Sequence, residues 1–380
     1  MAAPDTDLLI LGGGLSGGLC ALALAQRRPD VRVTIVEPGE RLGGNHLWSF
    51  FDSDVAERDA ALVEPLIAHR WDAYEVRFPA HRRDLTQAYR TIASERLDAA
   101  VRQALPTERI IRAAATSIGP DRVALDDGRT LTAQAVLDAR GGQADGLRLG
   151  WQKFVGQLLR IPQGHGVAAP VVMDATVDQA DGYRFVYLLP FSPTELFVED
   201  TYYTDGRELD VELLRDRIGD YAAERGWQVA ERTREETGQL PVLTGGSFDD
   251  FWPAGDPLAR AGARGGFFHP LTSYSLPDAV RFASWLADDL PLDRLAQATR
   301  QRAQRHWRRT AYDRFLARML FRAADPPHRY RVLQRFYRLP APLIARFYAG
   351  QSTVMDRVRI LAGRPPVSIW RAMRVLKDGG

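Results

Sequence analysis

A glycine-rich turn between a short apolar strand and an apolar helix constrains this chain more than any other feature. The pattern predicts a buried strand over Asp7 to Leu11 and an Ala/Leu-rich helix from about Leu15 to Arg28. Between them, Gly12, Gly14 and Gly17 fit the spacing G-x-G-x-x-G. A strand, a glycine turn and a helix in this order are typical of the βαβ unit that binds dinucleotides.

The turn and its surroundings supply candidate cofactor-binding residues. The glycines permit a tight turn and close approach of a pyrophosphate, while the helix start at Leu15 and Ser16 offers free N–H groups. A second predicted strand, Val31 to Glu37, ends in an acid that can accept hydrogen bonds from an adenosine ribose. Asp138 ends another predicted strand and faces the same crevice if the sheet is parallel. The alternative is a glycine-rich turn without a ligand.

Proteins that bind NAD and proteins that bind FAD share this motif, so another segment of the sequence must distinguish the two cofactors. Residues 261–280, AGARGGFFHPLTSYSLPDAV, offer glycines, a proline turn and a helix start that could cover a flavin. The residues expected to bind the cofactor there are His269, Ser275, Leu276 and Pro277. These features favour FAD. His269 and His46 lack the paired-ligand spacing of a metal site, so each is assigned a hydrogen-bonding or cofactor-lining role and no metal is expected.

Two adjacent acids, Glu199 and Asp200, stand inside the apolar stretch FVEDTYY. Residues 151–242 alternate like an antiparallel sheet, and alternation directs these two side chains to opposite faces. One of them can therefore enter a buried pocket, where burial would raise its pKa and let it donate a proton near neutral pH. The alternative is that an acid pairs with an arginine such as Arg184 on the neighbouring strand.

Length and composition limit the number of substructures, the cellular compartment and the kinds of partner that are expected. At 380 residues, the chain is expected to hold two or three substructures. The single cysteine, Cys20, excludes an internal disulfide and favours a reducing cytoplasm. From Arg294 onward there are 20 basic and 4 acidic residues, which could contact the acidic body of the chain, an anionic membrane or, least of all, nucleic acid. The apolar stretch 8–25 is explained by the glycine motif, so no transmembrane helix is expected.

Long stretches in one order along the chain resemble the bacterial lycopene β-cyclases of carotenoid biosynthesis. They are DLLILGGGLSGGL, GGNHLWSF, LDARG, GWQKFVG, MDATVDQADGYRFVYLLPF, FVEDTYY, FFHPLTSYSLPDAV, RYRVLQRFYRLPAPLIARFYAG and RILAGRPPVSI. The resemblance implies an α/β fold: a Rossmann-like FAD-binding domain of the aromatic hydroxylase and geranylgeranyl reductase type, a β-sheet substrate domain and C-terminal helices. On this basis we assign 1–75, 106–150 and 255–295 to a discontinuous FAD-binding domain, 76–105 and 151–254 to a substrate-binding domain, and 296–380 to a helical C-terminal region.

The resemblance also implies an activity. The family closes the ψ-ends of lycopene into β-ionone rings, through γ-carotene to β-carotene, in an acid-initiated isomerisation that requires reduced FAD, with NAD(P)H as the usual reductant. The first acid of the family's pair matches Glu199, which is the expected catalytic acid, and Asp200 is a supporting candidate. Lycopene and γ-carotene come from the membrane, so peripheral association with the inner face of the cell membrane is expected, through the basic tail.

Two alternatives belong to other classes. A flavin-dependent monooxygenase or geranylgeranyl reductase-like oxidoreductase would share the glycine motif, but it would consume NADPH and change the mass of its substrate. A carotenoid-binding protein without catalysis would have no use for a flavin crevice.

Overall fold

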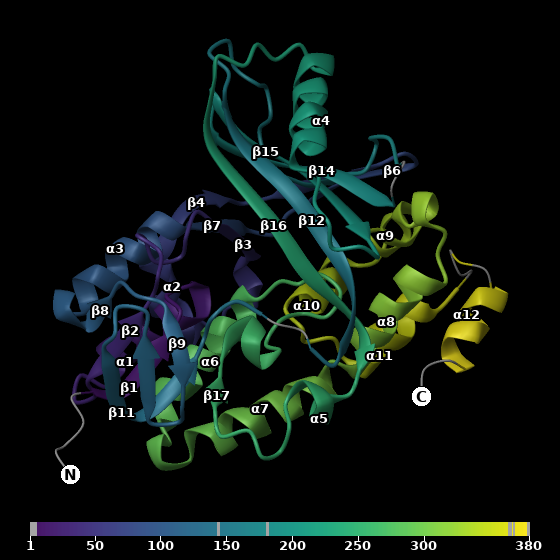
Figure 1. Cartoon of the computed structure of the whole chain (residues 1–380). Helices are drawn as coiled ribbons and strands as arrows, with labels where there is room; N and C mark the ends of the chain where they lie inside the picture. The colour runs from purple at the N-terminus through teal and green to yellow at the C-terminus, as the bar shows by residue number, and fades with distance from the viewer. Residues whose placement is uncertain (1–5, 143–144, 180–181, 364–366, 368, 378–380) are drawn as a thin grey trace.

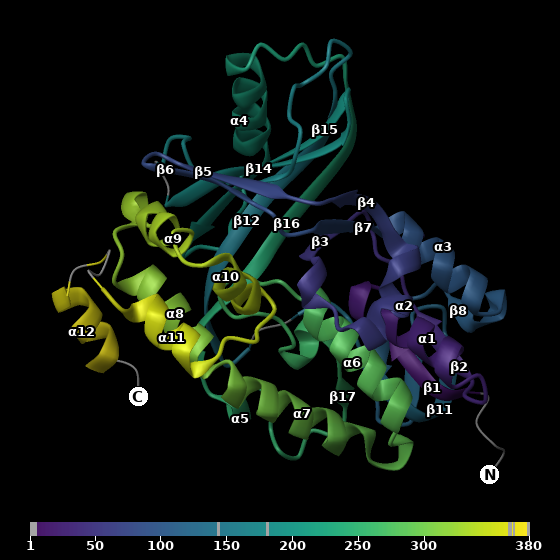
Figure 2. The same cartoon turned by 180° about the vertical axis from the view of Figure 1, so that it is seen from behind.

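Three β-sheets organise the chain (Figure 1). The computed structural model describes residues 6–142, 145–179, 182–363, 367 and 369–377, so the predicted domain limits at residues 1 and 380 lie outside the described residues. The described residues form a lower body, which holds the first sheet, and an upper blade of long strands (Figure 1). C-terminal helices lie against the blade on the side away from the N-terminal sheet (Figure 2).

The first sheet carries the glycine turn. Its central strand, β1 (Thr6–Leu11), pairs in parallel with β2 (Val33–Val36) and with β11 (Thr130–Asp138). The sheet is completed by β8 (Ile110–Ile111), β9 (Ala115–Ile118), β10 (Arg122–Leu125) and β17 (Ala259–Arg260). Apolar residues of this sheet share a core with α1 (Leu15–Arg27), α3 (Ser94–Ala104), α6 (Leu276–Asp289) and α7 (Leu295–Arg309). The predicted βαβ opening is confirmed, and β10 and β11 form an antiparallel hairpin beside it.

A small sheet joins the two larger ones. It contains β3 (Leu47–Phe51), β7 (Tyr89–Ala93) and β4 (Ile67–Trp71), all antiparallel. Short helical turns connect β3 to β4, at Asp52–Asp54, Glu57–Asp59, α2 (Ala60–Val63) and Glu64–Leu66. Other single turns lie at Thr107–Arg109, Gly262–Gly265, Leu292–Arg294 and Pro326–His328.

The large sheet forms the blade and has a different partner on each face. Its order is β16 (Glu231–Gly246), β12 (Leu147–Arg160), β15 (Glu195–Thr204), β14 (Tyr183–Ser192), β13 (Val171–Asp174), β5 (Tyr74–Phe78) and β6 (His81–Leu85). One face packs on α4 (Val211–Glu224), whose N-cap Asp210 accepts a hydrogen bond from the Leu213 N–H at 3.0 Å. The opposite face packs on the C-terminal helices. The strands predicted at GYRFVYLLP and ELFVEDTYY are therefore confirmed.

The C-terminal region is helical, as predicted. Its helices are α8 (Ala311–Arg322), α9 (Tyr330–Phe336), α10 (Ala341–Tyr348), α11 (Val354–Leu361) and α12 (Ile369–Lys377), and the short α5 (Phe248–Phe251) precedes them. None of the helices in the described ranges is long and apolar enough to cross a membrane. Residues 76–105 serve more than one unit, because β6 belongs to the large sheet while α3 packs in the core of α1. The division into domains stays a prediction.

The glycine turn is held by close backbone contacts. Gly12 has φ +95°, which disfavours any residue with a Cβ. A Cβ on Gly17 would lie 1.9 Å from the Gly12 carbonyl oxygen, whereas a Cβ on Gly14 would meet nothing within 4 Å. The first and third glycines are thus required by the fold, and the second leaves an open space.

Gly17→Ala should therefore lower the free energy of unfolding by at least about 1–3 kcal/mol, the cost of overpacking a tight contact. Denaturant unfolding of the cofactor-free protein measures this change. Gly14→Ala is the matched control and should unfold at the same denaturant concentration as the unsubstituted chain. Equal stability of the two variants would contradict the assignment.

Candidate active site

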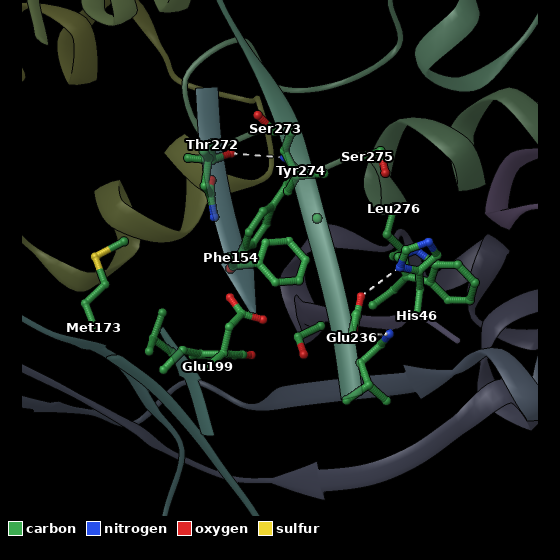
Figure 3. Close-up of a pocket in the computed structure, with 18 of the residues that line it drawn as sticks. His46, Phe154, Met173, Glu199, Glu236, Thr272, Ser273, Tyr274, Ser275 and Leu276 are labelled. Atoms are coloured by element: carbon green, nitrogen blue, oxygen red, sulfur yellow. Dashed lines mark hydrogen bonds and ion pairs between the residues drawn. The ribbon is translucent and has the colours of Figure 1, made fainter. Parts of the chain in front are cut away.

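An aromatic cavity of about 240 Å³ lies between the large sheet, the small sheet and the turn that precedes α6 (Figure 3). Its residues come from segments far apart in the sequence. The lining includes His46, Leu47, Trp48, Ser49, Gln152, Phe154, Met173, Phe185, Tyr187, Glu199, Tyr203, Glu236, Leu240, Thr272, Ser273, Tyr274, Ser275, Leu276 and Tyr348. Two carboxylates and several aromatic rings therefore line one cavity.

Strand register explains how the sheet builds one wall of the cavity. Glu199 on β15 pairs with Tyr187 on β14 and with Gly156 on β12, and Gly156 in turn pairs with Glu236 on β16. Directly paired residues of an antiparallel sheet point to the same face. Tyr187, Glu199 and Glu236 consequently form a single row across the sheet, with a glycine between the two acids.

Glu199 occupies a sheltered part of this wall. Only its Oε1 has a hydrogen-bond partner among the described residues, the Thr201 hydroxyl, which donates at 2.6 Å. The pKa of Glu199 is raised to about 8. Burial is the largest cause, the negative charges of Glu236 and Asp200 act in the same direction, and the Thr201 hydrogen bond opposes them. The side chain faces the cavity, so a carboxyl group that is protonated near neutral pH is available to a ligand there (Figure 3).

Asp200 lies on the opposite face, as alternation predicts. Its neighbours on the strand, Val198 and Tyr202, belong to the core against α4. The Arg184 guanidinium donates to Asp200 Oδ2 at 2.7 and 2.9 Å. The ion pair that the sequence allowed for one of the acids thus forms at Asp200, and the structure does not bring Asp200 to the cavity.

Glu236 is a cavity acid that sequence reasoning missed. Its Oε2 accepts a hydrogen bond from the Leu47 N–H at 3.0 Å, and its Oε1 lies 2.8 Å from His46 Nδ1. The carboxylate is 4% exposed, whereas the His46 side chain is 46% exposed. The predicted hydrogen-bonding role of His46 is confirmed. The sequence signal was weak, because Glu236 stands in the charged run ERTREET, beside a second glutamate.

The turn from His269 to Pro277 brings some predicted residues to the cavity and not others. Ser275 and Leu276, at the start of α6, line it. Pro277 follows inside the first turn of that helix. His269 does not line it, because its buried Nδ1 accepts hydrogen bonds from Leu271 and Thr272 N–H groups at 3.3 Å and so holds the turn together. Burial lowers the pKa of His269, which keeps it neutral.

The carboxyl edge of the first sheet holds the other predicted cofactor residues. Helix α1 begins at Leu15 and Ser16, and Gly14, its N-cap, supplies no side-chain hydrogen bond. Glu37 accepts hydrogen bonds from the Gly13 and Gly39 N–H groups at 2.8 and 2.9 Å. These groups lie together at the end of β1, where a dinucleotide would meet free N–H groups.

Asp138 reaches the same sheet edge, where it pairs with Leu11. Its carboxylate binds Arg140 at 2.9 Å and Arg264 at 3.1 Å. Burial raises the pKa of Asp138, but the hydrogen bond from Arg140 and the charge of Arg264 outweigh this effect and lower it overall. Asp138 therefore ties β11 to the segment that leads to α6.

Aromatic hydroxyl groups surround the cavity in a buried network. Tyr89 lies 2.8 Å from the Tyr187 hydroxyl and 3.3 Å from that of Tyr274, and Tyr348 bonds Tyr337 at 2.6 Å. Burial raises the pKa of each of these phenols, so all stay neutral. The rings offer π-faces without introducing charge.

Comparisons with known proteins agree on one family. The family model described as lycopene cyclase protein matches residues 7–374. A lycopene beta-cyclase of Pseudescherichia vulneris is 46% identical, over 97% of this chain and 96% of that protein. Among solved structures, a geranylgeranyl bacteriochlorophyll reductase-like protein of Thermoplasma acidophilum has a TM-score of 0.62 at 12% identity, covering 98% of each chain.

A flavin-dependent brominase has a TM-score of 0.58 at 12% identity, covering 91% of this chain and 93% of the brominase. At these identities, the two solved structures establish the α/β fold alone. The family match and the curated relative, each spanning nearly the whole sequence, establish more: this chain belongs to the lycopene cyclase family.

Proposed function

We propose that this protein closes the ψ-ends of lycopene into β-ionone rings, through γ-carotene to β-carotene, with Glu199 as the acid that starts the reaction. The observation that carries the proposal is a carboxyl group with a pKa raised to about 8 in the wall of an aromatic cavity. Membership of the lycopene cyclase family supplies the substrate class. Ring closure is an isomerisation, so substrate and product have the same mass.

FAD fits the residues at the edge of the first sheet. The open space at Gly14 and the uncapped N-terminus of α1 suit a pyrophosphate, and Glu37 suits the adenosine ribose. Ser275 and Leu276 would hold the flavin end beside the cavity. When bound, reduced FAD supplies negative charge that stabilises a cation on the substrate. NAD(P)H is proposed as the reductant.

The two carboxyl oxygens of Glu199 have different roles in the proposed proton transfer. Oε1 accepts the hydrogen bond from Thr201, so Oε2 carries the acidic proton. Transfer of this proton to the terminal C1–C2 double bond leaves a tertiary cation at C1, which the electrons of the C5–C6 double bond attack. The new C1–C6 bond closes the ring and moves the positive charge to C5. Loss of the C6 proton then forms the β-ring double bond.

The cavity wall supports the cation in two ways. The lining includes the aromatic residues Tyr187, Tyr203 and Phe154, and the faces of such rings carry negative quadrupole charge that attracts a cation. The neutral phenols add no competing nucleophile, because burial keeps their pKa values high. A substrate that fills the cavity would displace water and so prevent its capture of the cation as an alcohol.

Membrane docking is proposed for α11 and α12. Large exposed apolar side chains of the described residues gather on these helices, with Met355 at 76% and Trp370 at 79% exposure. Arg359 and Arg374 are exposed beside them, as suits an anionic surface. Other arginines of the tail pair with the body, as Arg300 does with Asp249, so only part of the basic charge is free for lipid. We place the protein on the inner face of the cell membrane.

A second, apolar cavity offers the hydrocarbon a path from that surface. It measures about 140 Å³ and is lined by residues of α8, α9, α10 and α11. Leu271 and Phe347 in its wall are adjacent in sequence to Thr272 and Tyr348 in the wall of the first cavity. Two short segments, 271–272 and 347–348, thus contribute to the walls of both cavities.

Glu199→Gln should abolish proton donation while retaining the shape of the site, so ring formation should fall by about 10²–10⁴-fold, the usual contribution of general acid catalysis. Pigments extracted from lycopene-producing cells, with the flavin content of the purified protein checked, measure the loss. Asp200→Asn makes the same change on the other face and should instead lower stability by about 3–5 kcal/mol, because it breaks a buried ion pair. Normal flavin content with undiminished ring formation in Glu199→Gln would eliminate the proposed acid.

Ring formation should decline as pH rises through about 8, because the proton on Glu199 is then lost. The folded-state pKa lies above the ordinary value of 4.5, so the stability that this group contributes is complete below pH 4.5 and is lost as pH rises through about 8. Unfolding of the protein and of Glu199→Gln across this range tests the second statement. A stability difference between them that does not change with pH would refute the raised pKa.

Met355→Glu combined with Trp370→Glu should reduce binding to anionic vesicles by at least about tenfold, because two apolar side chains no longer enter the lipid. Vesicle flotation at low and high salt measures binding, and high salt should weaken it. Leu213→Glu, an exposed apolar position on α4, is the matched control and should float normally. Flotation of the double variant at the level of the unsubstituted protein would refute docking through these helices.

A further inference from the structure

The proposed reaction begins with one proton transfer and ends with another, and Glu199 accounts only for the first. The cation at C5 can lose a proton from C6, from C4 or from the methyl group on C5, and these losses give three different rings. Only loss from C6 gives the β-ring. A positioned base is therefore needed to select the product as well as to complete the reaction.

Glu236 is the cavity group with the properties of that base. It lies in the same row as Glu199, two strands away, which places the two backbones about 10 Å apart. The ring of Phe197 covers Gly156 between them, so apolar surface separates the carboxylates. Figure 3 shows both side chains on the same side of the sheet, with Glu236 beside His46.

The surroundings of the two acids differ in the way that acid and base roles require. Glu199 has one hydrogen bond, from a neutral hydroxyl, whereas Glu236 accepts from the Leu47 N–H and has His46 Nδ1 at 2.8 Å. When its proton is on Nδ1, His46 donates to Glu236 as well. The negative charge of Glu236 also helps to keep Glu199 protonated. These different surroundings suit Glu199 to donate a proton and Glu236 to accept one.

We propose that the Glu236 carboxylate removes the C6 proton and so fixes the product as a β-ring, an inference that rests on the proposed cyclisation. The proton passes from C6 to Glu236, and the electrons of the C6–H bond form the C5–C6 double bond. One proton has then left Glu199 and one has reached Glu236, so the substrate keeps its composition. Glu236 returns the proton to water through His46, whose side chain is 46% exposed.

Glu236→Gln tests the inference through the kind of ring produced. We expect normal flavin content, a fall in ring formation of at least about tenfold, and a larger share of rings with the double bond at C4 or on the methyl carbon. Such rings shorten the conjugated chain, so absorption and chromatographic mobility identify them. Glu235→Gln is the matched control: its side chain binds Arg215 and Gln157 outside the cavity, and its products should remain all β.

Two further variants keep the test decisive. Glu236→Asp retains the charge but withdraws it by one methylene, so it should show the same change in ring type to a smaller extent, even if Glu236→Gln does not fold. His46→Asn should leave the ring type unchanged and slow repeated turnover more than the first turnover, because His46 is a positioning residue that acts on proton release.

The outcomes distinguish a failure of the role proposed for Glu236 from a failure of the proposed cyclisation. Failure of the unsubstituted protein to form rings would overturn the proposed function. Ring formation by the unsubstituted protein, together with unchanged rate and only β-rings from folded Glu236→Gln or from Glu236→Asp, would overturn the role of Glu236 alone.

Discussion

The partial removal of one carboxyl group from water is the constraint on which the proposed chemistry depends. Glu199 can be an acid near neutral pH only while protein surrounds it, because burial is the largest contribution to its raised pKa. A strong cationic partner would remove that property. The nearby arginine, Arg184, is instead engaged by Asp200 on the other face of the same strand. The second acid therefore gives the strand an ion pair on its α4 face and leaves the cavity face without one.

The two faces of the large sheet thus have different roles: one stabilises the fold and the other lines the cavity. Its α4 face holds aliphatic side chains and the buried ion pair. The cavity face holds aromatic rings that lie over glycines, as Phe154 does over Gly238 and Phe197 over Gly156. A side chain at either glycine would displace the ring above it, and at Gly238 that ring, Phe154, lines the cavity. The alternation of a β-strand is the reason that neighbouring residues can meet such different demands.

Local patterns in the sequence were sufficient for the glycine turn, for the strand that carries Glu199 and for the opposite directions of the two acids. They could not locate Glu236, because its place beside Glu199 depends on the register of both strands with β12, and register is a property of the assembled sheet. His269 shows the same limit. Its sequence context indicates a cofactor segment, but only the folded turn reveals that its nitrogen accepts from the backbone. Long matches to a known family identified the activity class, and the position of each side chain required the structure.

The cavity is closed by Tyr348 of α10, although its opposite wall includes His46 near the other end of the chain. A growing polypeptide therefore lacks part of the cavity wall until residue 348 has left the ribosome. The nucleotide half and the blade can gain their own cores earlier, since domains generally fold as units during synthesis. A polyene can therefore be held between all the walls of the cavity only after α10 has packed against the sheet.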